Sequence, residues 1–224
     1  MKINFLTLFP RYFEAFKNES IIAKAIEKKI IEINVIDIRD FSQNKHRKVD
    51  DEIFGGGHGM LLQIEPIDLA LKKTKGFKIA LSPQGKVFDQ KMAKEFSKLK
   101  EITLIAGRYE GFDERIIDYL VDEEISIGDF VLTGGELPAM VVADAIIRLV
   151  DGVIKKESHE NESFENDLLD YPQYTRPRNY KDLLVPEVLF SGNHKNIDAW
   201  KKQKQLEKTK KNRPDLLERK KHAK

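Results

Sequence analysis

The hydrophobic positions of the first 150 residues fall into two patterns that follow one another along the chain. Short apolar or alternating runs predict strands at 3–9, 31–37, 78–81, 102–106 and 124–127. Apolar residues at helical spacing predict helices at 12–17, 20–29, 63–73, 90–98, 114–120 and 136–150. Because strands that alternate with helices are typical of a parallel sheet, this part of the chain is predicted to be an α/β domain.

The hydrophobic pattern weakens after residue 150. Residues 151–166 are mostly polar and acidic, and the next segment carries prolines and aromatic residues. Lysine-rich helices are predicted at 195–210 and 214–221. The predicted organisation is therefore a first domain at 1–155, a linker at 156–172 and a basic helical domain at 173–224. The helical domain has few apolar positions and would need support from the first domain or from a partner chain.

Glycines gather where three of the predicted strands end. The segments are Leu81-Ser-Pro-Gln-Gly85, Ala106-Gly-Arg-Tyr-Glu-Gly-Phe-Asp113 and Ser126-Ile-Gly-Asp-Phe-Val-Leu-Thr-Gly-Gly-Glu-Leu-Pro-Ala-Met140. The adjacent Gly134 and Gly135 allow another backbone or a ligand to approach closely, and Pro138 can open the next helix. Since the carboxyl ends of parallel strands share one edge of the sheet, the three segments predict one ligand pocket at that edge.

A fourth glycine segment, Gly55-Gly-Gly-His-Gly-Met60, follows a basic stretch at 45–48 and the carboxylates Asp50 and Asp51. It has no Gly-Lys-Ser/Thr ending and no strand directly before it, which excludes a nucleotide P-loop and a dinucleotide fingerprint. The residues fit either a loop that binds a nucleotide or a mobile surface loop. His58 has no second ligand at metal spacing, so these residues predict no metal site.

Composition narrows the class of protein. The chain has 224 residues, of which 41% are hydrophobic, and it contains no cysteine, which excludes disulfides, thiolate metal sites and cysteine nucleophiles. No apolar run approaches the roughly 20 residues of a membrane span, and the first residues lead directly into a predicted strand. These features predict a soluble cytoplasmic protein.

The net charge of +2 conceals an uneven distribution. Residues 171–224 hold 15 Lys and Arg against 6 Asp and Glu, which gives +9, and the remaining 24 basic and 31 acidic residues give −7. A basic tail on a mildly acidic body predicts a polyanionic partner that binds at the tail. A solvated lysine-rich helix is the alternative interpretation.

The glycine motifs, together with Asp170-Tyr-Pro-Gln-Tyr-Thr-Arg-Pro177, resemble those of the bacterial tRNA (guanine-N1)-methyltransferases, the TrmD family. The similarity runs in order from Phe5-Leu-Thr-Leu-Phe-Pro10 to Arg213-Pro-Asp-Leu-Leu217. It implies an α/β fold of the SPOUT superfamily, with a trefoil-knotted parallel sheet and a small C-terminal helical domain. Spacing alone predicts an open sheet, because knots are nearly absent among protein folds.

The resemblance also implies an activity. Family members work as homodimers with the active site at the subunit interface, and they use S-adenosylmethionine to methylate N1 of guanosine 37 of tRNA, next to the anticodon. Two alternatives stay open, namely a knotted methyltransferase that acts on ribosomal RNA and a catalytically silent RNA-binding protein. The residues that the resemblance assigns to the methyl donor are Leu81, Ser82, Pro83, Gly85, Gly107, Tyr109, Glu110, Gly111, Ser126, Ile127, Gly128, Asp129, Phe130, Val131, Leu132, Gly134, Gly135 and Pro138.

Two residues are implied to be catalytic. Guanine N1 carries a proton at neutral pH, so a base is required, and Glu162 occupies the position of the family aspartate in an Asp-Ser-Phe pattern. Asp167 and Asp170 are nearby rivals, and the change to glutamate is the one feature that favours a silent protein. Arg148 matches the arginine that stabilises negative charge on guanine O6; from its position alone it would cap the carbonyls of a helix end.

The resemblance implies further contacts. Magnesium dependence is implied, with Glu110 as a candidate contributor and no ligand cluster that would locate the ion. His58 stands where a smaller or imino residue is expected. The residues assigned to tRNA are Lys45, His46, Asp50 and Gly59 in the loop near the anticodon, and Arg176, Lys201 and Lys202 as phosphate contacts.

Overall fold

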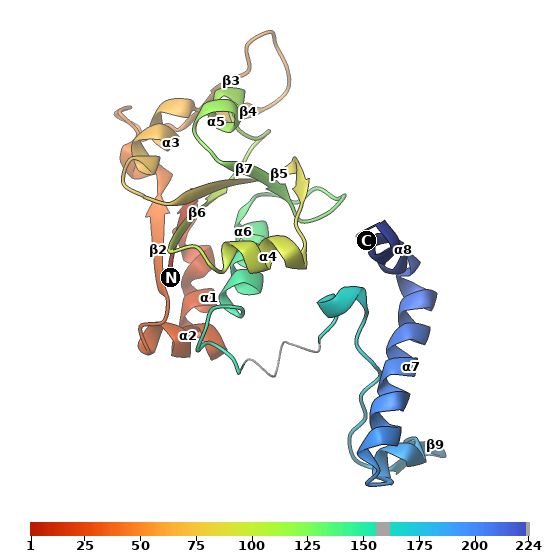
Figure 1. Ribbon diagram of the computed structural model, residues 1–224. Helices are drawn as coiled ribbons and strands as arrows, with labels where there is room; N and C mark the ends of the chain where they lie inside the picture. Colours follow the sequence, from red (N-terminus) through yellow and green to blue (C-terminus); the bar gives the residue numbers. More distant parts are fainter. Residues whose placement is uncertain (156–161, 223–224) are drawn as a thin grey trace. The chain divides into compact units, whose positions relative to one another are not determined.

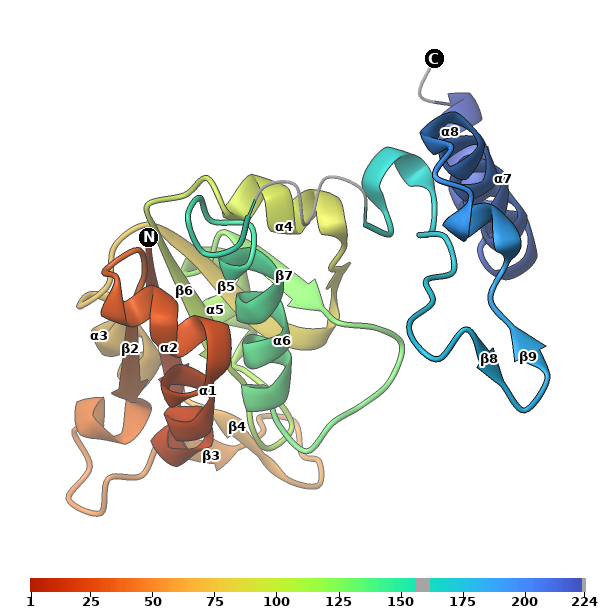
Figure 2. The ribbon, with the colours of Figure 1, turned by 90° about the horizontal axis from the view of Figure 1, so that it is seen from below.

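The computed structural model describes residues 1–155 and 162–222 (Figures 1 and 2). Residues 156–161 of the predicted linker lie outside the described residues. Contacts within the chain divide it into two compact units, Met1–Ile154 and Lys155–Lys224.

The first unit is built on a five-stranded sheet. Figure 1 labels β2, β5, β6 and β7 of this sheet. Its strands lie in the order β2-β1-β6-β5-β7, and every pair is parallel. The bounds are β1 Lys2–Thr7, β2 Glu32–Asp37, β5 Phe77–Val87, β6 Glu101–Ala106 and β7 Glu123–Ser126. The predicted α/β class with a parallel sheet is confirmed.

Side chains of the strands alternate between two apolar layers. On one face, residues such as Phe5 and Leu104 pack with α1, α2, α4 and α6. On the other face, residues such as Leu6 and Ile105 pack with α3 and α5. The helices are α1 Glu14–Asn18, α2 Ser20–Glu27, α3 Ile64–Leu71, α4 Gln90–Phe96, α5 Glu114–Tyr119 and α6 Glu136–Ile147.

The hydrophobic pattern missed a short antiparallel pair in the first unit, β3 Asp50–Glu52 with β4 Met60–Leu62. Its first strand is Asp-Asp-Glu, a sequence with low strand propensity. The predicted helix at 12–17 is instead a 3-10 helix, Pro10–Phe13, followed by α1. A second 3-10 helix, Ile38–Phe41, follows β2. The helix predicted at 136–150 ends at Ile147.

Strand β5 is longer than its apolar core predicts. Its register against β7 shifts between Leu81 and Lys86, both of which lie opposite Ile125. Pro83 falls inside this irregularity, where a strand can accommodate a residue without an N–H. The bulge places residues 82–85 at the end of β6 and β7, beside the glycine loops.

The second unit is mainly helical. Its elements are the 3-10 helix Glu165–Asp167, β8 Asn179–Tyr180 and β9 Leu183–Leu184, the 3-10 helix Glu187–Phe190, α7 His194–Asn212 and α8 Pro214–His222. Figure 2 shows β8 and β9 as a short hairpin. Asn193 caps α7 by accepting a hydrogen bond from Asn196 N at 3.2 Å. Thr209 and Leu216 are buried in this unit.

Candidate functional site

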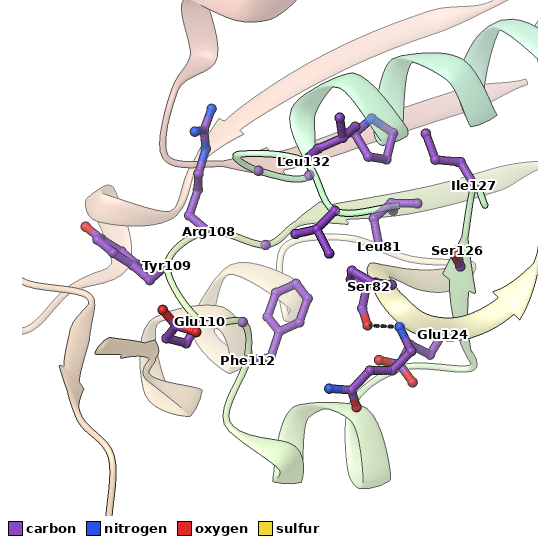
Figure 3. Close-up of a pocket in the computed structure, with 18 of the residues that line it drawn as sticks. Leu81, Ser82, Arg108, Tyr109, Glu110, Phe112, Glu124, Ser126, Ile127 and Leu132 are labelled. Atoms are coloured by element: carbon purple, nitrogen blue, oxygen red, sulfur yellow. Dashed lines mark hydrogen bonds between the residues drawn. The ribbon is translucent and has the colours of Figure 1, made fainter. Parts of the chain in front are cut away.

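A pocket opens at the carboxyl edge of the sheet, where the irregular part of β5 and the segments that follow β6 and β7 meet the start of α6 (Figure 3). The structure thus brings together residues from three predicted glycine loops. Those assigned to the donor that line the pocket are Leu81, Ser82, Pro83, Gly107, Tyr109, Glu110, Gly111, Ser126, Ile127, Gly128, Phe130, Val131, Leu132, Gly134, Gly135 and Pro138.

Two residues assigned to the donor do not line this pocket. Gly85 lies at the crossing of β5 and β7, where an added Cβ would be 2.4 Å from the backbone carbon of Glu124. Its glycine is therefore explained by backbone packing. Asp129 is exposed on the loop between β7 and α6.

Several pocket residues escaped the sequence analysis. Arg108, Phe112 and Thr133 lie inside the glycine motifs, so the glycines next to them in the sequence could have indicated that they line the pocket. Gln84 also lies inside a glycine motif and Glu124 begins a predicted strand, while Glu114 and Ile117 carry no motif. Only the three-dimensional approach of the loops brings these last residues to the pocket.

The loops that follow β6 and β7 are in direct backbone contact. Gly135 N donates a hydrogen bond to Gly107 O at 2.7 Å. A Cβ on Gly135 would be 2.6 Å from Gly107 N and 2.7 Å from the Cα of Ala106. Since these are backbone atoms that cannot rotate away, only glycine fits at position 135.

The pocket is lined by apolar side chains, by the three acidic residues Glu110, Glu114 and Glu124, and by Arg108. Leu81, Ile127 and Leu132 supply apolar surface, and Figure 3 shows Glu110 and Glu124 on different sides of the pocket. The Ser126 hydroxyl donates to Gly128 O at 3.0 Å and so holds the turn that follows β7. Apolar walls with several carboxylates are suited to a ligand that has an apolar part and a positive charge.

The β3–β4 pair is attached to the loop that follows β6. Glu110 N donates to Met60 O at 3.0 Å, and Leu62 N donates to Gly111 O at 3.0 Å. A Cβ on Gly59 would be 2.5 Å from Glu110 Cγ. Gly59, which the resemblance assigns to tRNA, therefore lies beside a residue of the pocket.

The other residues assigned to tRNA in this region lie before and within β3. Lys45 and His46 are exposed, and the N–H of His46 donates to Asn44 Oδ1 at 2.7 Å. Asp50 is half-buried and pairs with Leu62 across the two strands. Lys48 forms an ion pair with Asp51 at 3.0 Å, which offsets part of the acidic charge of β3.

Asp113 fixes the end of the loop that follows β6. Its side chain caps α5 by accepting from Arg115 N at 3.0 Å, and the Arg115 guanidinium donates to both carboxylate oxygens at 2.8 and 2.6 Å. The hydrogen bond from Arg115 lowers the pKa of the Asp113 carboxyl, against the opposing effect of partial burial.

The structure does not bring Arg148 to the pocket within its own chain. Arg148 follows the last residue of α6, and its N–H donates to Asp144 O at 3.1 Å. Pro138 is at the other end of the same helix, about 15 Å away at 1.5 Å per residue. Glu162, Asp167 and Asp170 belong to the second unit.

The segment that contains Glu162 is held on α7 by one buried hydroxyl. Thr209 Oγ1 accepts from Leu169 N at 2.9 Å and donates to Gln205 O at 2.7 Å. Asp170 N donates to Ser163 Oγ at 3.0 Å, which folds the segment on itself. The Thr209 side chain of α7 therefore helps to fix the segment that contains the predicted base.

Replacing Thr209 by valine should loosen this segment. The variant leaves Leu169 N without its acceptor, which should lower the free energy of unfolding by about 1–3 kcal/mol. Urea denaturation of the full chain measures the effect, and Thr209→Ser, which keeps the hydroxyl, is the matched control. A Thr209→Val protein as stable as the wild type would show that this hydrogen bond does not hold the segment.

The three residues assigned to tRNA phosphates lie on the second unit. Arg176 and Lys202 are exposed, and Lys201 Nζ lies 5.0 Å from the centre of the Tyr171 ring. In the described part of the chain, residues 1–155 and 162–222, no helix is both long and apolar enough to cross a membrane.

The fold and the pocket define a class of protein. It has a parallel α/β sheet, and three glycine-bearing segments at the carboxyl edge enclose a pocket suited to a partly apolar, positively charged ligand. Comparison with known proteins narrows this class. The sequence model of the family described as tRNA (Guanine-1)-methyltransferase TrmD matches residues 1–219.

Individual relatives agree with the family model. The chain is 72% identical to the tRNA (guanine-N(1)-)-methyltransferase of Mycoplasmopsis synoviae (strain 53), over 100% of both chains. It is 67% identical to the protein of that name from Mycoplasmopsis pulmonis, again over 100% of both chains. Identity to the Fusobacterium nucleatum protein is 58%, over 97% of this chain and 92% of the relative. The chain belongs to the TrmD family, which confirms the resemblance found in its motifs.

Proposed function

We propose that this protein transfers the methyl group of S-adenosylmethionine to N1 of guanosine 37 of tRNA, beside the anticodon. The observation that carries the proposal is family membership over residues 1–219, a range that includes all three glycine loops and the basic helix α7. This role would place the protein in the cytoplasm.

The pocket suits the proposed donor. S-adenosylmethionine supplies a methyl group that is already activated on a sulfonium. Leu81, Ile127 and Leu132 would contact its flat adenine, while Glu110 and Glu124 offer carboxylates to its positive charges. The glycines support the fit. A side chain at position 107 would meet the Phe112 ring, and one at position 135 would meet the backbone of the loop after β6, so either would distort the pocket.

Glu162 is proposed as the base that removes the N1 proton of guanine, and Arg148 as the group that stabilises negative charge on O6. Each assignment follows from position in the family motifs. Because Pro138 and Arg148 are at opposite ends of α6, one chain cannot bring Arg148 to its own pocket through this helix. We therefore propose a homodimer in which a second copy completes the active site at the subunit interface.

A trefoil knot is proposed for the first unit, following the family. The loops after β6 and β7 touch, with Gly135 N bonded to Gly107 O, which is compatible with a knot in this region. The C-terminal helical domain at 173–224 is proposed to bind the anticodon arm.

Magnesium does not fit the residues present. Within residues 1–155 and 162–222, no group of three or more His, Cys, Asp or Glu side chains could hold a metal ion. Glu110 contributes to the pocket as a single carboxylate. No step of the proposed reaction is assigned to the ion.

The proposed RNA contacts give a salt-dependent prediction. The loop residues Lys45, His46, Asp50 and Gly59 would meet bases near the anticodon, and Arg176, Lys201 and Lys202 would meet phosphates. Replacing Lys202 by alanine should weaken tRNA binding. It should also reduce, by about one, the steepness with which the logarithm of the tRNA association constant falls with the logarithm of the salt concentration.

Filter binding of tRNA from 50 to about 200 mM salt measures this slope, in a range where phosphate contacts dominate the dependence. Lys91→Ala is the matched control, since Lys91 is an exposed lysine on α4 of the acidic first unit. Equal slopes for Lys202→Ala and the wild type would remove Lys202 from the interface.

Transfer of a labelled methyl group separates the proposed activity from its rivals. We expect label in a tRNA transcript and none in a ribosomal RNA fragment. Label in the ribosomal fragment alone would establish the other methyltransferase, and binding of RNA without transfer to either substrate would establish a silent RNA-binding protein.

A further inference from the structure

An arginine that lines the pocket joins the loop after β6 to the start of α6 and to the loop before that helix. Arg108 lies in the loop after β6 (Figure 3). Its Nε donates to Glu136 Oε2 at 2.8 Å, and its Nη1 donates to the carbonyl oxygen of Thr133 at 2.9 Å. One guanidinium therefore binds both the first turn of α6 and the loop that precedes it.

The partner carboxylate is almost inaccessible to solvent. The Glu136 side chain is 1% exposed, and its other oxygen accepts from Thr7 Oγ1 at 2.8 Å. Thr7 in turn accepts from Phe9 N at 2.9 Å, so the network extends to the end of β1. The Arg108 guanidinium lies 4.6 Å from the centre of the Phe9 ring, which supports it from another side.

The burial of the Arg108–Glu136 ion pair does not by itself show that the pair stabilises the fold. Removing two charges from water offsets most of their attraction, and buried pairs are often no more stable than apolar replacements. What the pair adds is geometry, because a planar guanidinium donates in fixed directions to two different acceptors. Here one acceptor is a loop carbonyl of the pocket wall.

The loop at 131–135 is shaped around this guanidinium. A Cβ on Gly134 would be 2.2 Å from Arg108 Nε, so the loop backbone passes directly against the side chain. Leu132 and Gly134 both line the pocket. The position of the pocket wall therefore depends on where Arg108 holds Thr133 O.

We propose that Arg108, held by Glu136 and Thr7, is a positioning residue that fixes the 131–135 loop in the conformation that binds the methyl donor. The proposal rests on the proposed function, since it takes S-adenosylmethionine as the ligand. Arg108 acts through the loop, so its removal should weaken donor affinity without affecting the affinity for tRNA.

Loss of stability must be separated from loss of positioning. Arg108→Leu alone leaves the Glu136 carboxylate buried without its partner, and the melting temperature should fall by about 10 °C. The double variant Arg108→Leu with Glu136→Gln removes the unpaired charge while glutamine keeps an acceptor for Thr7. It should regain most of the melting temperature, yet Thr133 O still lacks its donor.

A second variant keeps the charge in place. Arg108→Lys preserves an ammonium opposite Glu136 but cannot reach two acceptors in the fixed directions of a guanidinium. Arg115→Leu is the matched control, because Arg115 also pairs with a carboxylate through two hydrogen bonds but does not line the pocket. Its donor affinity should stay within about twofold of wild type, as expected for an exposed ion pair.

Calorimetry with S-adenosylmethionine in the absence of RNA tests the proposal, alongside melting temperatures and steady-state kinetics. We expect the donor Kd and KM of the double variant and of Arg108→Lys to rise about tenfold or more, with the KM for tRNA unchanged. Wild-type donor affinity in a stable Arg108→Lys or double variant would overturn the positioning role. Failure of the wild-type protein to bind the donor would instead contradict the proposed function itself.

Discussion

Alanine at position 135 should abolish tight binding of S-adenosylmethionine. The backbone of Gly135 is already helical, with φ −82° and ψ −3°, so alanine meets no strain of its own. Its Cβ would, however, lie 2.6 Å from Gly107 N, and the two glycine loops must separate to admit it. Displacement of about 1 Å at a reacting centre can lower a rate 100-fold, and we expect at least that loss in kcat/KM.

Gly192→Ala controls for the general effect of removing a glycine. Gly192 has φ +69° and open space around its Cα, so alanine there meets backbone strain of about 1–2 kcal/mol but no clash. Calorimetry should show normal donor binding by Gly192→Ala and none by Gly135→Ala. Normal donor binding by both variants would disprove the loop contact as the basis of the site.

Replacing Glu162 by glutamine should lower the methyl-transfer rate by about 100- to 10,000-fold, the usual contribution of a general base. Glutamine keeps the shape of the side chain but cannot take the N1 proton of guanine. Because the pocket at the edge of the sheet is lined by residues of the first unit and Glu162 belongs to the second, the Kd for S-adenosylmethionine should not change. Single-turnover rates with saturating donor and tRNA measure the chemical step.

Glu162→Asp and Asp170→Asn complete the comparison. The aspartate variant restores the residue of the family motif and should retain activity. Asp170 already uses both carboxylate oxygens, one for Tyr171 N at 2.8 Å and one for Gln173 Nε2 at 2.8 Å, so its role is expected to be structural. Near-normal turnover by Glu162→Gln, together with an inactive Asp170→Asn variant, would identify Asp170 as the base instead.

The sequence predicts the first unit well where packing follows a simple period. Ile102-Thr-Leu-Ile-Ala106 is apolar except for Thr103 because β6 lies in the centre of the sheet, between β1 and β5. The pattern failed at β3, where Asp50 and Asp51 form a strand because Leu62 on β4 hydrogen-bonds to the loop at 107–113. β3 pairs with β4, and β4 is in turn bonded to Gly111, about 50 residues away from Leu62, a contact that local propensity cannot indicate.

The candidate site shows the same division. The role of Gly135 can be predicted from the sequence, because two adjacent glycines indicate that another backbone segment approaches closely. The sequence indicates Arg108 only as a member of its glycine motif. Its hydrogen bond to Glu136 depends on how the loop after β6 and α6 are arranged in space, which the sequence pattern does not predict. Glu124 carries no motif and enters the pocket because the β5 bulge passes beside it. The roles of Glu162 and Arg148 stay predictions that rest on family motifs.

The central claim is that the three glycine loops bind a sulfonium donor for methylation of guanine N1 in tRNA. Primer extension on a tRNA transcript incubated with the protein and S-adenosylmethionine tests it most directly, because a methyl group on N1 blocks base pairing. The account predicts a stop immediately 3′ of guanosine 37 that disappears when the donor is omitted. Full-length extension through guanosine 37, or a donor-dependent stop at another base, would contradict it.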